Sequence, residues 1–256
     1  MQNRLKLSAI IIAKNEEENI GRCLESLVGC IDDIVVIVDD KSTDKTLEIV
    51  KSFENVSYFI SEWKGYSATK QLAVEKTKHD WILWIDSDEA LTEELKNELL
   101  KFKETEPKYF VYSVARRAYF LGKWIKHSGW YPGRVERLFN KHKAKFSDSE
   151  VHEHLVYEGK AGELKADLEH YTDPDIHHYF EKFNRYTTLA AKELQAKNKN
   201  ATLNDLLLRP IFLFGKMYFI RLGFLDGLHG FVLAVFSSTY VFVKYAKLWQ
   251  LNLGKK

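Results

Sequence analysis

The chain has 256 residues, of which 45% are hydrophobic and 29% are charged, so it is long and apolar enough to fold around a core. This composition excludes a wholly disordered chain, and a formal net charge of +2 gives no reason to expect a nucleic-acid partner. The two cysteines, Cys23 and Cys30, are expected to be reduced, buried thiols, which fits a cytosolic compartment. The apolar run at residues 7–13 is too short for a membrane span, and no signal peptide is predicted.

The first hundred residues alternate between apolar runs and amphipathic stretches. The apolar runs predict four buried strands, at residues 7–13, 34–38, 56–60 and 81–85. Stretches with apolar residues three and four apart predict helices at about residues 20–28, 47–53, 67–78 and 92–102, with Asn15 as the cap of the first. Strands that alternate with helices build a mainly parallel sheet covered on both faces, so the sequence predicts an α/β fold.

After Pro107 the regular alternation of apolar runs and amphipathic stretches ends. Weak alternation predicts a strand at residues 109–115, and a further strand is predicted to end near residues 137–139. A helix is predicted at residues 177–195, and the remainder is rich in Leu, Phe and Tyr. We therefore expect a catalytic domain at residues 1–200 and apolar or amphipathic helices at residues 201–256.

Two acidic clusters follow predicted strands. Asp86-Ser87-Asp88 comes at the end of the strand WILWI, and Asp39-Asp40 comes at the end of IVVIV. Parallel sheets bind ligands at the carboxyl ends of their strands, so both clusters are predicted at the ligand-binding edge. Carboxylates at Asp86 and Asp88 suit Mg²⁺ or Mn²⁺ bridging a substrate diphosphate, although a solvated turn with a helix cap at Asp88 is the alternative.

The second cluster suits a nucleoside. A carboxylate of Asp39 or Asp40 can accept hydrogen bonds from a base N–H or from ribose hydroxyls, and the sequence does not choose between the two. Helix capping is the competing role, but Ser42 and Asp44 suit it better.

Other polar residues are candidates for binding and catalysis. Lys70, just before the acidic strand, could meet a phosphate or could be solvated. Arg134 and Arg137 lie in an aromatic, basic stretch and suit phosphate or sugar contacts, with a structural ion pair as the alternative. His152 could complete a metal site and Glu153 could be a general base, although this part of the chain has many histidines that could simply be packed or solvated.

These pieces together resemble an inverting family 2 glycosyltransferase with the GT-A fold, within the group similar to bacterial lipopolysaccharide-core glucosyltransferases. The resemblance covers nearly the whole chain. It is carried by the segments LSAIIIAKNEEENI, VIVDDKSTDKT, EWKGYSATKQLA, WILWIDSDEALTEEL, YFLGKWIKHSGWYPGRVERLFN, VHEHLVYEG, HYT with NRYTTLAA, and GFLDGLHGFVLA with KYAKLW. Two departures, Lys41 for a common glycine and Gln71 for a common asparagine, leave the donor open.

The resemblance implies roles for single residues. Ala13, Asn15 and Glu16 would line the nucleotide pocket, Asp39 or Asp40 would contact uridine, and Lys70 would lie near the diphosphate. Asp86 and Asp88 would form the Asp-x-Asp motif, with Asp88 as the direct metal ligand. His152 and Glu153 fall where the group has a His-Glu pair, with Glu153 as the expected base.

The implied reaction transfers a hexose from a nucleotide sugar, such as UDP-glucose, to a hydroxyl of a glycolipid or lipopolysaccharide-core acceptor with inversion of configuration. A polyprenyl-phosphate or protein acceptor is an alternative. A nucleotidyltransferase is a second alternative, but AKNEEEN stands where its glycine-rich loop would be. A non-catalytic sugar- or nucleotide-binding module would not need both aspartates, and no G-x-G-x-x-G follows the first strand to indicate an NAD-binding domain.

The last fifty residues have the features of a segment that associates with a membrane. Residues 227–243 carry no formal charge and lie at the lower limit of length for a span, while glycines and basic residues interrupt and flank the run. Helices lying at a membrane interface are therefore preferred to a span, and a hairpin packed on the catalytic domain is a compatible alternative. The expected location is the cytoplasmic side of the inner membrane, as a peripheral or monotopic protein.

Overall fold

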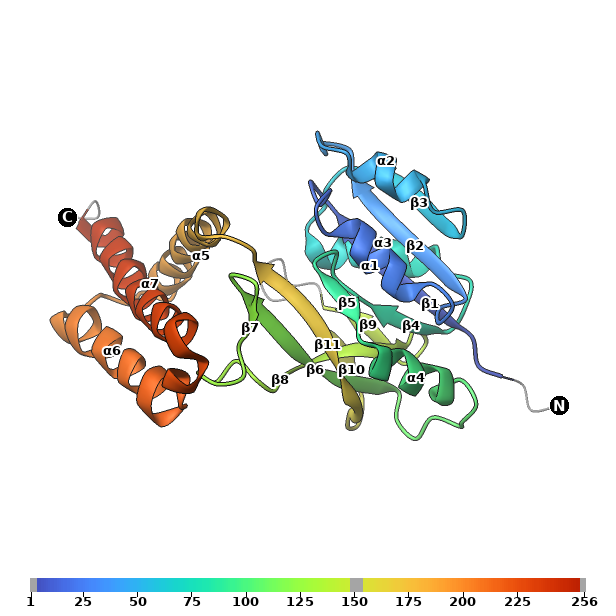
Figure 1. Cartoon of the computed structure of the whole chain (residues 1–256). Coiled ribbons are helices and arrows are strands. Elements are labelled where there is room, and N and C mark those ends of the chain that lie inside the picture. The colour runs from blue at the N-terminus through green and yellow to red at the C-terminus, as the bar shows by residue number, and fades with distance from the viewer. Residues whose placement is uncertain (1–3, 148–153, 254–256) are drawn as a thin grey trace. The chain divides into compact units, whose positions relative to one another are not determined.

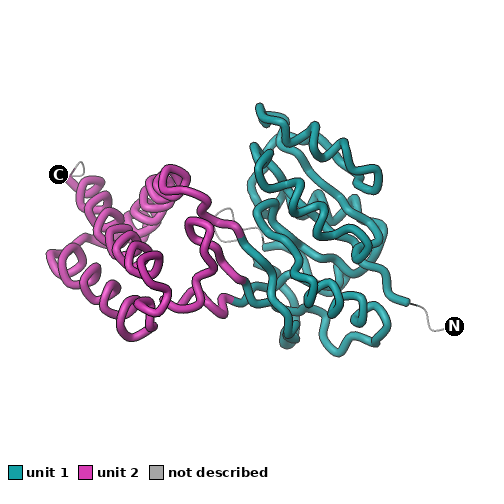
Figure 2. The backbone as a smooth tube through the Cα atoms, in the orientation of Figure 1, with its two compact units in different colours: residues 1–116, 134–170 teal, residues 117–133, 171–256 magenta. Residues whose placement is uncertain are grey.

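The computed structural model describes residues 4–147 and 154–253, and the chain forms two compact units (Figure 2). The first unit comprises residues 1–116 and 134–170, and the second comprises residues 117–133 and 171–256. This division differs from the expected one at residue 200. Residues 171–200 join the C-terminal helices because the helix within them packs along the last helix of the chain.

The first unit is built on a mixed sheet (Figure 1). Its strand order is β3-β2-β1-β4-β8-β6-β11-β5, with β7 paired to β6, and β9 and β10 form a separate pair. The strands are β1 (Leu7–Ala13), β2 (Asp33–Asp39), β3 (Val56–Ser61), β4 (Trp81–Trp84), β5 (Glu89–Leu91), β6 (Val111–Phe120), β7 (Lys123–Trp124), β8 (Gly133–Asn140), β9 (Ala144–Phe146), β10 (Leu155–Tyr157) and β11 (Gly162–Asp173).

The strands β3, β2, β1 and β4 pair in parallel, which brings their carboxyl ends to one edge of the sheet. Both faces of β1 and β2 are buried, so their runs have no polar alternation. The odd positions of β1, such as Leu7 and Ile11, join one core, and the even positions, such as Ile10 and Ile12, join the other. The predicted parallel arrangement is therefore confirmed.

Helices and the small strand pair cover the two faces of this sheet. The core of one face contains residues of α1 (Ile20–Leu27), α2 (Thr46–Lys51) and α4 (Glu93–Phe102). The core of the other contains residues of α3 (Tyr66–Glu75), β9 and β10. The first helix begins at Ile20 with Asn19 before it, so the predicted cap at Asn15 is wrong; Asn15 has a φ of 53° and accepts a hydrogen bond from the Thr43 N–H instead.

The later strands add antiparallel pairs to the parallel half. β8 pairs antiparallel with β4, and β11 pairs antiparallel with β5. The second register places His170 opposite Glu89 and so brings β11 beside the Asp86–Asp88 segment. This long-range pairing positions a side chain that the local pattern of the first hundred residues does not contain.

The second unit contains the C-terminal helices. They are α5 (Ile176–Ala196), α6 (Leu203–Gly215), a π-helical turn η1 (Lys216–Ile220), a short 3₁₀ turn η2 (Gly223–Asp226) and α7 (Gly227–Leu253). Both α5 and α6 pack on α7. Within the described residues, Gly223–Leu253 is the stretch long and apolar enough to cross a membrane by length and composition, and 22% of its most apolar window is buried.

The buried aspartate of the second unit closes a tight turn. The Asp226 carboxylate accepts hydrogen bonds from the backbone N–H groups of Lys126 and His127, and its backbone oxygen accepts one from the Lys123 ammonium. Gly230 packs so closely on Gly223 that a Cβ atom would lie 1.9 Å from the Gly223 oxygen. The segment GFLDGLHG therefore has a structural reason for its glycines and its aspartate.

Candidate active site

The Asp86-Ser87-Asp88 segment lies between β4 and β5 at the carboxyl edge of the parallel strands. The backbone N–H of Asp86 donates to Glu89 Oε2 at 3.0 Å, and the Asp86 carbonyl lies 3.6 Å from the Cys23 sulfur. These contacts hold the segment against α1 and fix the direction in which its two aspartates point.

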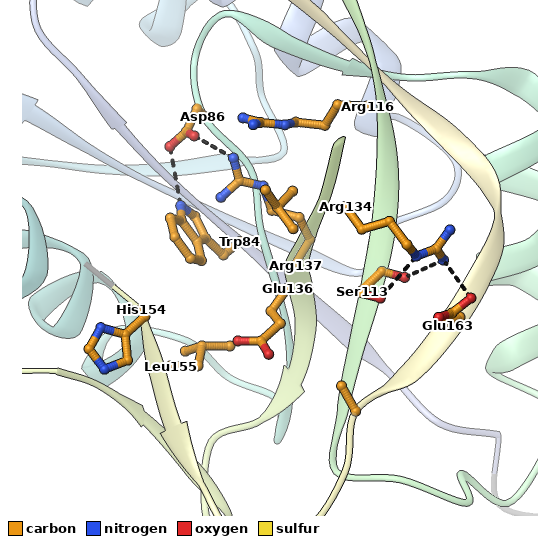
Figure 3. Close-up of a pocket in the computed structure, with 12 residues that line it drawn as sticks. Trp84, Asp86, Ser113, Arg116, Arg134, Glu136, Arg137, His154, Leu155 and Glu163 are labelled. Carbon is orange, nitrogen blue, oxygen red and sulfur yellow. Dashed lines mark hydrogen bonds and ion pairs between the residues drawn. The ribbon is translucent and has the colours of Figure 1, made fainter. Parts of the chain in front are cut away.

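Asp86 is surrounded by donors. Arg137 Nη2 donates to its Oδ2 at 2.5 Å, and Trp84 Nε1 donates to its Oδ1 at 3.2 Å (Figure 3). Lys70 Nζ also donates to Oδ1, at 3.1 Å. Burial alone would raise the pKa of Asp86, but the charges of Arg137 and Lys70 outweigh it and hold that pKa well below its usual range. Asp86 is thus a permanently ionised carboxylate whose charge is already compensated.

Glu89 is a second carboxylate behind this segment. Its side chain is fully buried, and Arg137 Nη2 donates to its Oε1 at 2.7 Å. Burial raises the pKa of Glu89 despite the attraction of Arg137. Arg137 therefore bridges Asp86 and Glu89, and its guanidinium also stacks 4.2 Å from the Trp84 ring.

Asp88 has different surroundings from Asp86. The two side chains are similarly exposed, at 31% for Asp86 and 25% for Asp88, but Asp88 Oδ2 lies 3.3 Å from Nε2 of His170, which β11 supplies. A carboxylate oxygen and an imidazole nitrogen this close, both with access to solvent, form a donor set that Mn²⁺ or Mg²⁺ accepts. Within residues 4–147 and 154–253, no group of three or more His, Cys, Asp and Glu side chains gathers around a common point. The Asp88–His170 pair therefore fits part of a metal site, with the remaining positions open to ligands and water.

The other acidic cluster lies at the end of β2, on the same edge. The Asp39 side chain is fully buried and accepts hydrogen bonds from Lys14 Nζ at 3.0 Å and from the Lys41 N–H at 2.8 Å. Burial would raise the pKa of Asp39, but the Lys41 N–H and the Lys14 ammonium keep it below the usual value. Asp40 is exposed. The structure thus separates a buried Asp39 from an exposed Asp40, a distinction that the sequence left open.

The residues expected around the nucleotide lie at the end of β1. Ala13 is buried as the last residue of that strand, and Asn15 and Glu16 follow in the loop before α1. Asn15 Oδ1 ties this loop to Thr43 in the loop after β2, and the Glu16 N–H donates to Thr46. The two loops therefore form one hydrogen-bonded rim beside Asp39 and Asp40.

Lys70 and Arg137 are more deeply buried than the sequence suggested. Both side chains are 2% exposed and both pair with Asp86, and Lys70 Nζ also lies 3.9 Å from the Trp84 ring centre. For Arg137, the structure supports the ion-pair alternative. For Lys70, burial against Asp86 replaces the solvated alternative.

A pocket of about 520 Å³ begins at Asp86 and runs along β8 to Glu163 at the start of β11 (Figure 3). Such a volume is within the range of small-molecule sites. Arg134 lines it, held by Ser113 Oγ at 3.3 Å and by the Leu164 carbonyl at 2.6 Å. The full lining is Trp84, Asp86, Ser113, Arg116, Arg134, Val135, Glu136, Arg137, His154, Leu155, Ala161 and Glu163.

The predicted pair His152 and Glu153 lies outside the described residues. The next residue, His154, is exposed and lines the pocket. The sequence reasoning assigned no role to His170, Glu89 or Arg116. The motif HYT contained His170, but only the antiparallel register of β11 with β5 shows that it meets the acidic segment.

Comparisons with known proteins identify the family of the chain. The family model described as Glycosyl transferase family 2 matches residues 8–157. The chain is 32% identical to the lipopolysaccharide core biosynthesis glycosyltransferase LpsC of Rhizobium meliloti, over 98% of this chain and 95% of that protein. It is 31% identical to an uncharacterized glycosyltransferase of Rickettsia typhi, over 98% and 89% of the two chains.

A solved structure is similar over the whole chain. The mannosyltransferase PcManGT from Pyrobaculum calidifontis, in complex with GDP-Man and Mn²⁺, covers 96% of this chain and 88% of its own, with a TM-score of 0.56 and 12% sequence identity. The likeness confirms the expected GT-A type of fold. On the family match and the relatives together, the chain belongs to glycosyl transferase family 2 and is a glycosyltransferase.

Proposed function

We propose that this glycosyltransferase moves a hexose from a UDP-sugar to a hydroxyl of a glycolipid or lipopolysaccharide-core acceptor, with inversion at the anomeric carbon. The observation that carries the proposal is the contrast between two neighbouring aspartates. Both are partly exposed, but Asp86 pairs with Lys70 and Arg137, whereas Asp88 lies beside His170 at the edge where the rim of the nucleotide pocket lies.

Different residues of the donor site would bind the cation, position the loop and hold the nucleoside. Asp88 and His170 would hold a divalent cation, and Asp86, fixed by two cations, would orient the segment that presents Asp88. When bound, a divalent cation at this point neutralises the charge that develops on a departing diphosphate. The rim formed by Ala13, Asn15 and the Asp39–Asp40 cluster would hold the nucleoside on the other side of β4 from the pocket.

The transfer itself would be a single displacement. The acceptor hydroxyl attacks the anomeric carbon, Glu153 takes the hydroxyl proton, and the nucleoside diphosphate leaves from the opposite face of the sugar. The carboxylate is the right chemical group for this proton transfer, since it accepts a proton from an oxygen nucleophile as the new glycosidic bond forms.

The acceptor class rests on the relatives and on the C-terminal helices. LpsC is named for lipopolysaccharide core biosynthesis, and the chain matches nearly all of it. The second unit exposes large apolar side chains next to basic ones, as a surface that lies on a membrane would. We infer that the enzyme works at the cytoplasmic side of the inner membrane, where it would meet a lipid-linked acceptor.

A donor and acceptor screen tests the proposal. Purified full-length protein is incubated with UDP-glucose, UDP-galactose, UDP-N-acetylglucosamine or GDP-mannose, with Mn²⁺ or Mg²⁺, and nucleoside diphosphate release is measured. The acceptors are lipopolysaccharide-core oligosaccharide, a polyprenyl phosphate and a protein mixture. We expect acceptor-stimulated release of UDP with the core oligosaccharide, an inverted linkage by NMR, and no release from Asp88→Ala. Release stimulated only by polyprenyl phosphate or protein would refute the proposed acceptor.

A further inference from the structure

Arg116 lines the pocket and has no carboxylate oxygen within hydrogen-bonding distance among residues 4–147 and 154–253. It lies on β6, and its guanidinium points toward Asp86 and Arg137 (Figure 3). Its side chain is 29% exposed, and the nearest carboxylate oxygen, Glu89 Oε1, is 3.8 Å away, beyond hydrogen-bonding distance. That oxygen already accepts from Arg137 at 2.7 Å. Arg116 is therefore a second cation near a carboxylate oxygen that already accepts a hydrogen bond from Arg137.

The polar atoms of Arg116 are also not all used. Its Nε is buried and has no hydrogen-bond partner among residues 4–147 and 154–253. A buried guanidinium N–H normally has an acceptor, because burying it without one costs free energy. Burial and the neighbouring Arg137 lower the pKa of Arg116, although nearby carboxylates oppose this.

The contacts of the neighbouring cations show the same difference. Lys70 and Arg137 lie within 3.1 Å of the carboxylates that they pair with, whereas Arg116 is 3.8 Å from Glu89. Arg116 also lines the 520 Å³ pocket. A partly desolvated guanidinium is well suited to a carboxylate or phosphate, which its planar N–H groups can bind in pairs.

The strand order indicates which substrate Arg116 faces. The rim that would hold the nucleoside lies at the ends of β1 and β2, on one side of β4. Arg116 lies on β6, which is separated from β4 by β8 on the other side. A group bound by Arg116 would therefore approach Asp86 and Asp88 from the side opposite the nucleoside, as the acceptor must.

We propose that the pocket between Asp86 and Glu163 binds the acceptor saccharide, and that Arg116 recognises an acidic group, a carboxylate or a phosphate, on that saccharide. The proposal deepens the proposed function and rests on it. Arg134, held rigidly by Ser113 and Leu164, lines the far part of the same pocket and would contact the next portion of the acceptor.

The experiment measures whether Arg116 and the acidic group act together. Full-length wild type, Arg116→Gln and Arg116→Lys are assayed with three probes, each a deacylated lipopolysaccharide-core oligosaccharide. One probe is native, one is dephosphorylated with hydrofluoric acid, and one has its carboxylates reduced with carbodiimide and borohydride. Kinetic constants for acceptor and donor are measured separately, together with slow hydrolysis of the donor in the absence of acceptor. The exposed Arg22→Gln on α1 is the matched control.

With the native probe, Arg116→Gln is expected to lower acceptor kcat/KM by about tenfold to a hundredfold, the usual effect of losing a charge-assisted contact. Donor KM and donor hydrolysis stay as in wild type. With the probe that lacks the recognised group, the acceptor kcat/KM of wild type falls to that of Arg116→Gln, and the acceptor kcat/KM of the variant falls no further. The probe on which this happens identifies phosphate or carboxylate. Arg116→Lys, which keeps the charge, should have an acceptor kcat/KM between those of wild type and Arg116→Gln. Arg22→Gln should have the same kinetic constants as wild type.

Two results overturn the inference. One is an equal loss for wild type and Arg116→Gln when the acidic group is removed, since independent effects mean that the two do not touch. The other is a rise in donor KM alone, which would place Arg116 at the diphosphate. The proposed function fails separately, if wild type transfers sugar to none of the probes. Thermal unfolding of each variant shows whether a loss of activity reflects a loss of fold, and Arg116→Lys supplies the comparison if Arg116→Gln unfolds.

Discussion

At the scale of single residues, Asp86 and Asp88 have opposite surroundings although only Ser87 separates them. Asp86 has two cations and an indole N–H as donors, whereas among the described residues Asp88 pairs with a histidine at 3.3 Å. A carboxylate that is already compensated binds a cation weakly, because binding would have to displace or crowd the existing donors. The motif therefore combines one carboxylate that shapes the loop with one that is available.

The first prediction concerns the metal requirement. His170→Gln should raise the Mn²⁺ concentration for half-maximal activity by about tenfold or more. The reason is that losing even an outer partner of a metal ligand typically lowers metal affinity by at least that factor. The measurement is a Mn²⁺ titration of UDP release. His142→Gln is the matched control, because His142 pairs with Asp80 on the surface, where both side chains are more than 60% exposed. An unchanged titration in His170→Gln would remove His170 from the metal site.

The second prediction concerns Arg137, the arginine between Asp86 and the buried Glu89. Arg137→Gln should lower the free energy of unfolding by about 3–5 kcal/mol, because it leaves Asp86 and Glu89 without their shared cation. Adding Glu89→Gln should recover part of that loss, since one uncompensated charge is removed. Urea unfolding measures both, with Arg22→Gln expected within about 0.5 kcal/mol of wild type. A double variant less stable than the single one would contradict this account.

The sequence predicted some of these residues and not others for a physical reason. Asp39, Asp86 and Asp88 follow apolar runs directly, so a local pattern places them at the carboxyl edge of the sheet. His170 and Arg116 lie on strands whose partners are set by long-range antiparallel pairing, and neighbouring residues carry no signal of it. The burial of Lys70 and Arg137 was missed for the same reason, because each is paired with a residue at least sixteen positions away.

At the scale of elements, the amino ends of the parallel strands are joined by one network. Asp33 at the start of β2 accepts hydrogen bonds from Ser8 Oγ in β1 at 2.8 Å and from the Lys78 N–H before β4 at 2.9 Å. Ser8 Oγ in turn accepts from the His79 N–H at 3.1 Å. A single buried carboxylate thus ties together the three strands whose opposite ends carry the site.

The third prediction follows from the pKa of that carboxylate. Burial would raise the pKa of Asp33, but the Lys78 N–H, the Ser8 hydroxyl and the Lys78 ammonium outweigh burial and hold it below the usual value. A depressed pKa means that Asp33 stabilises the fold above its ordinary pKa of about 3.9, and that this contribution is lost as pH falls through the lower, folded value. Asp33→Asn should therefore cost about 1–3 kcal/mol at pH 7 and progressively less below about pH 4.

Urea unfolding at pH 7, 5, 4 and 3 checks this pH dependence. Asp80→Asn is the matched control, because the Asp80 side chain is 62% exposed and lies in the same turn before β4. Its effect should stay within about 0.5 kcal/mol at every pH. A constant difference between wild type and Asp33→Asn from pH 7 to pH 3 would show that the ionised carboxylate is not what joins the strands.

At the scale of the whole molecule, the unit with the sheet and the unit with the C-terminal helices have different surfaces. Among the residues that the structure describes, more than half of the large exposed apolar side chains belong to residues 203–253. On α6 they fall on one face, with exposed fractions of 51–70% at Leu203, Leu207, Leu208, Ile211 and Phe212. Basic side chains of Arg209, Lys216 and Arg221 are exposed beside them. Apolar residues bordered by cations favour the interface of an anionic membrane.

The fourth prediction is that this face of α6 binds the membrane without spanning it. Leu208→Glu with Ile211→Glu should weaken sedimentation with vesicles of phosphatidylglycerol and phosphatidylethanolamine by at least about tenfold, because each exposed apolar side chain contributes over 1 kcal/mol when it enters the interface. Both positions are exposed, so the fold should be unchanged. The control is Val28→Glu, which alters an exposed apolar residue after α1.

Salt and alkali distinguish the two ways in which the C-terminal helices could hold a membrane. If α6 lies at the interface, 0.5 M NaCl weakens binding, because it screens the contribution of about 1 kcal/mol per basic residue near an anionic surface, and alkaline carbonate releases the protein. If α7 (Gly227–Leu253) spans the bilayer instead, neither treatment releases it and the double glutamate variant still sediments, since its apolar length does not depend on α6. Sedimentation of the variant at the wild-type level in 0.5 M NaCl would therefore replace the interfacial arrangement with a spanning one.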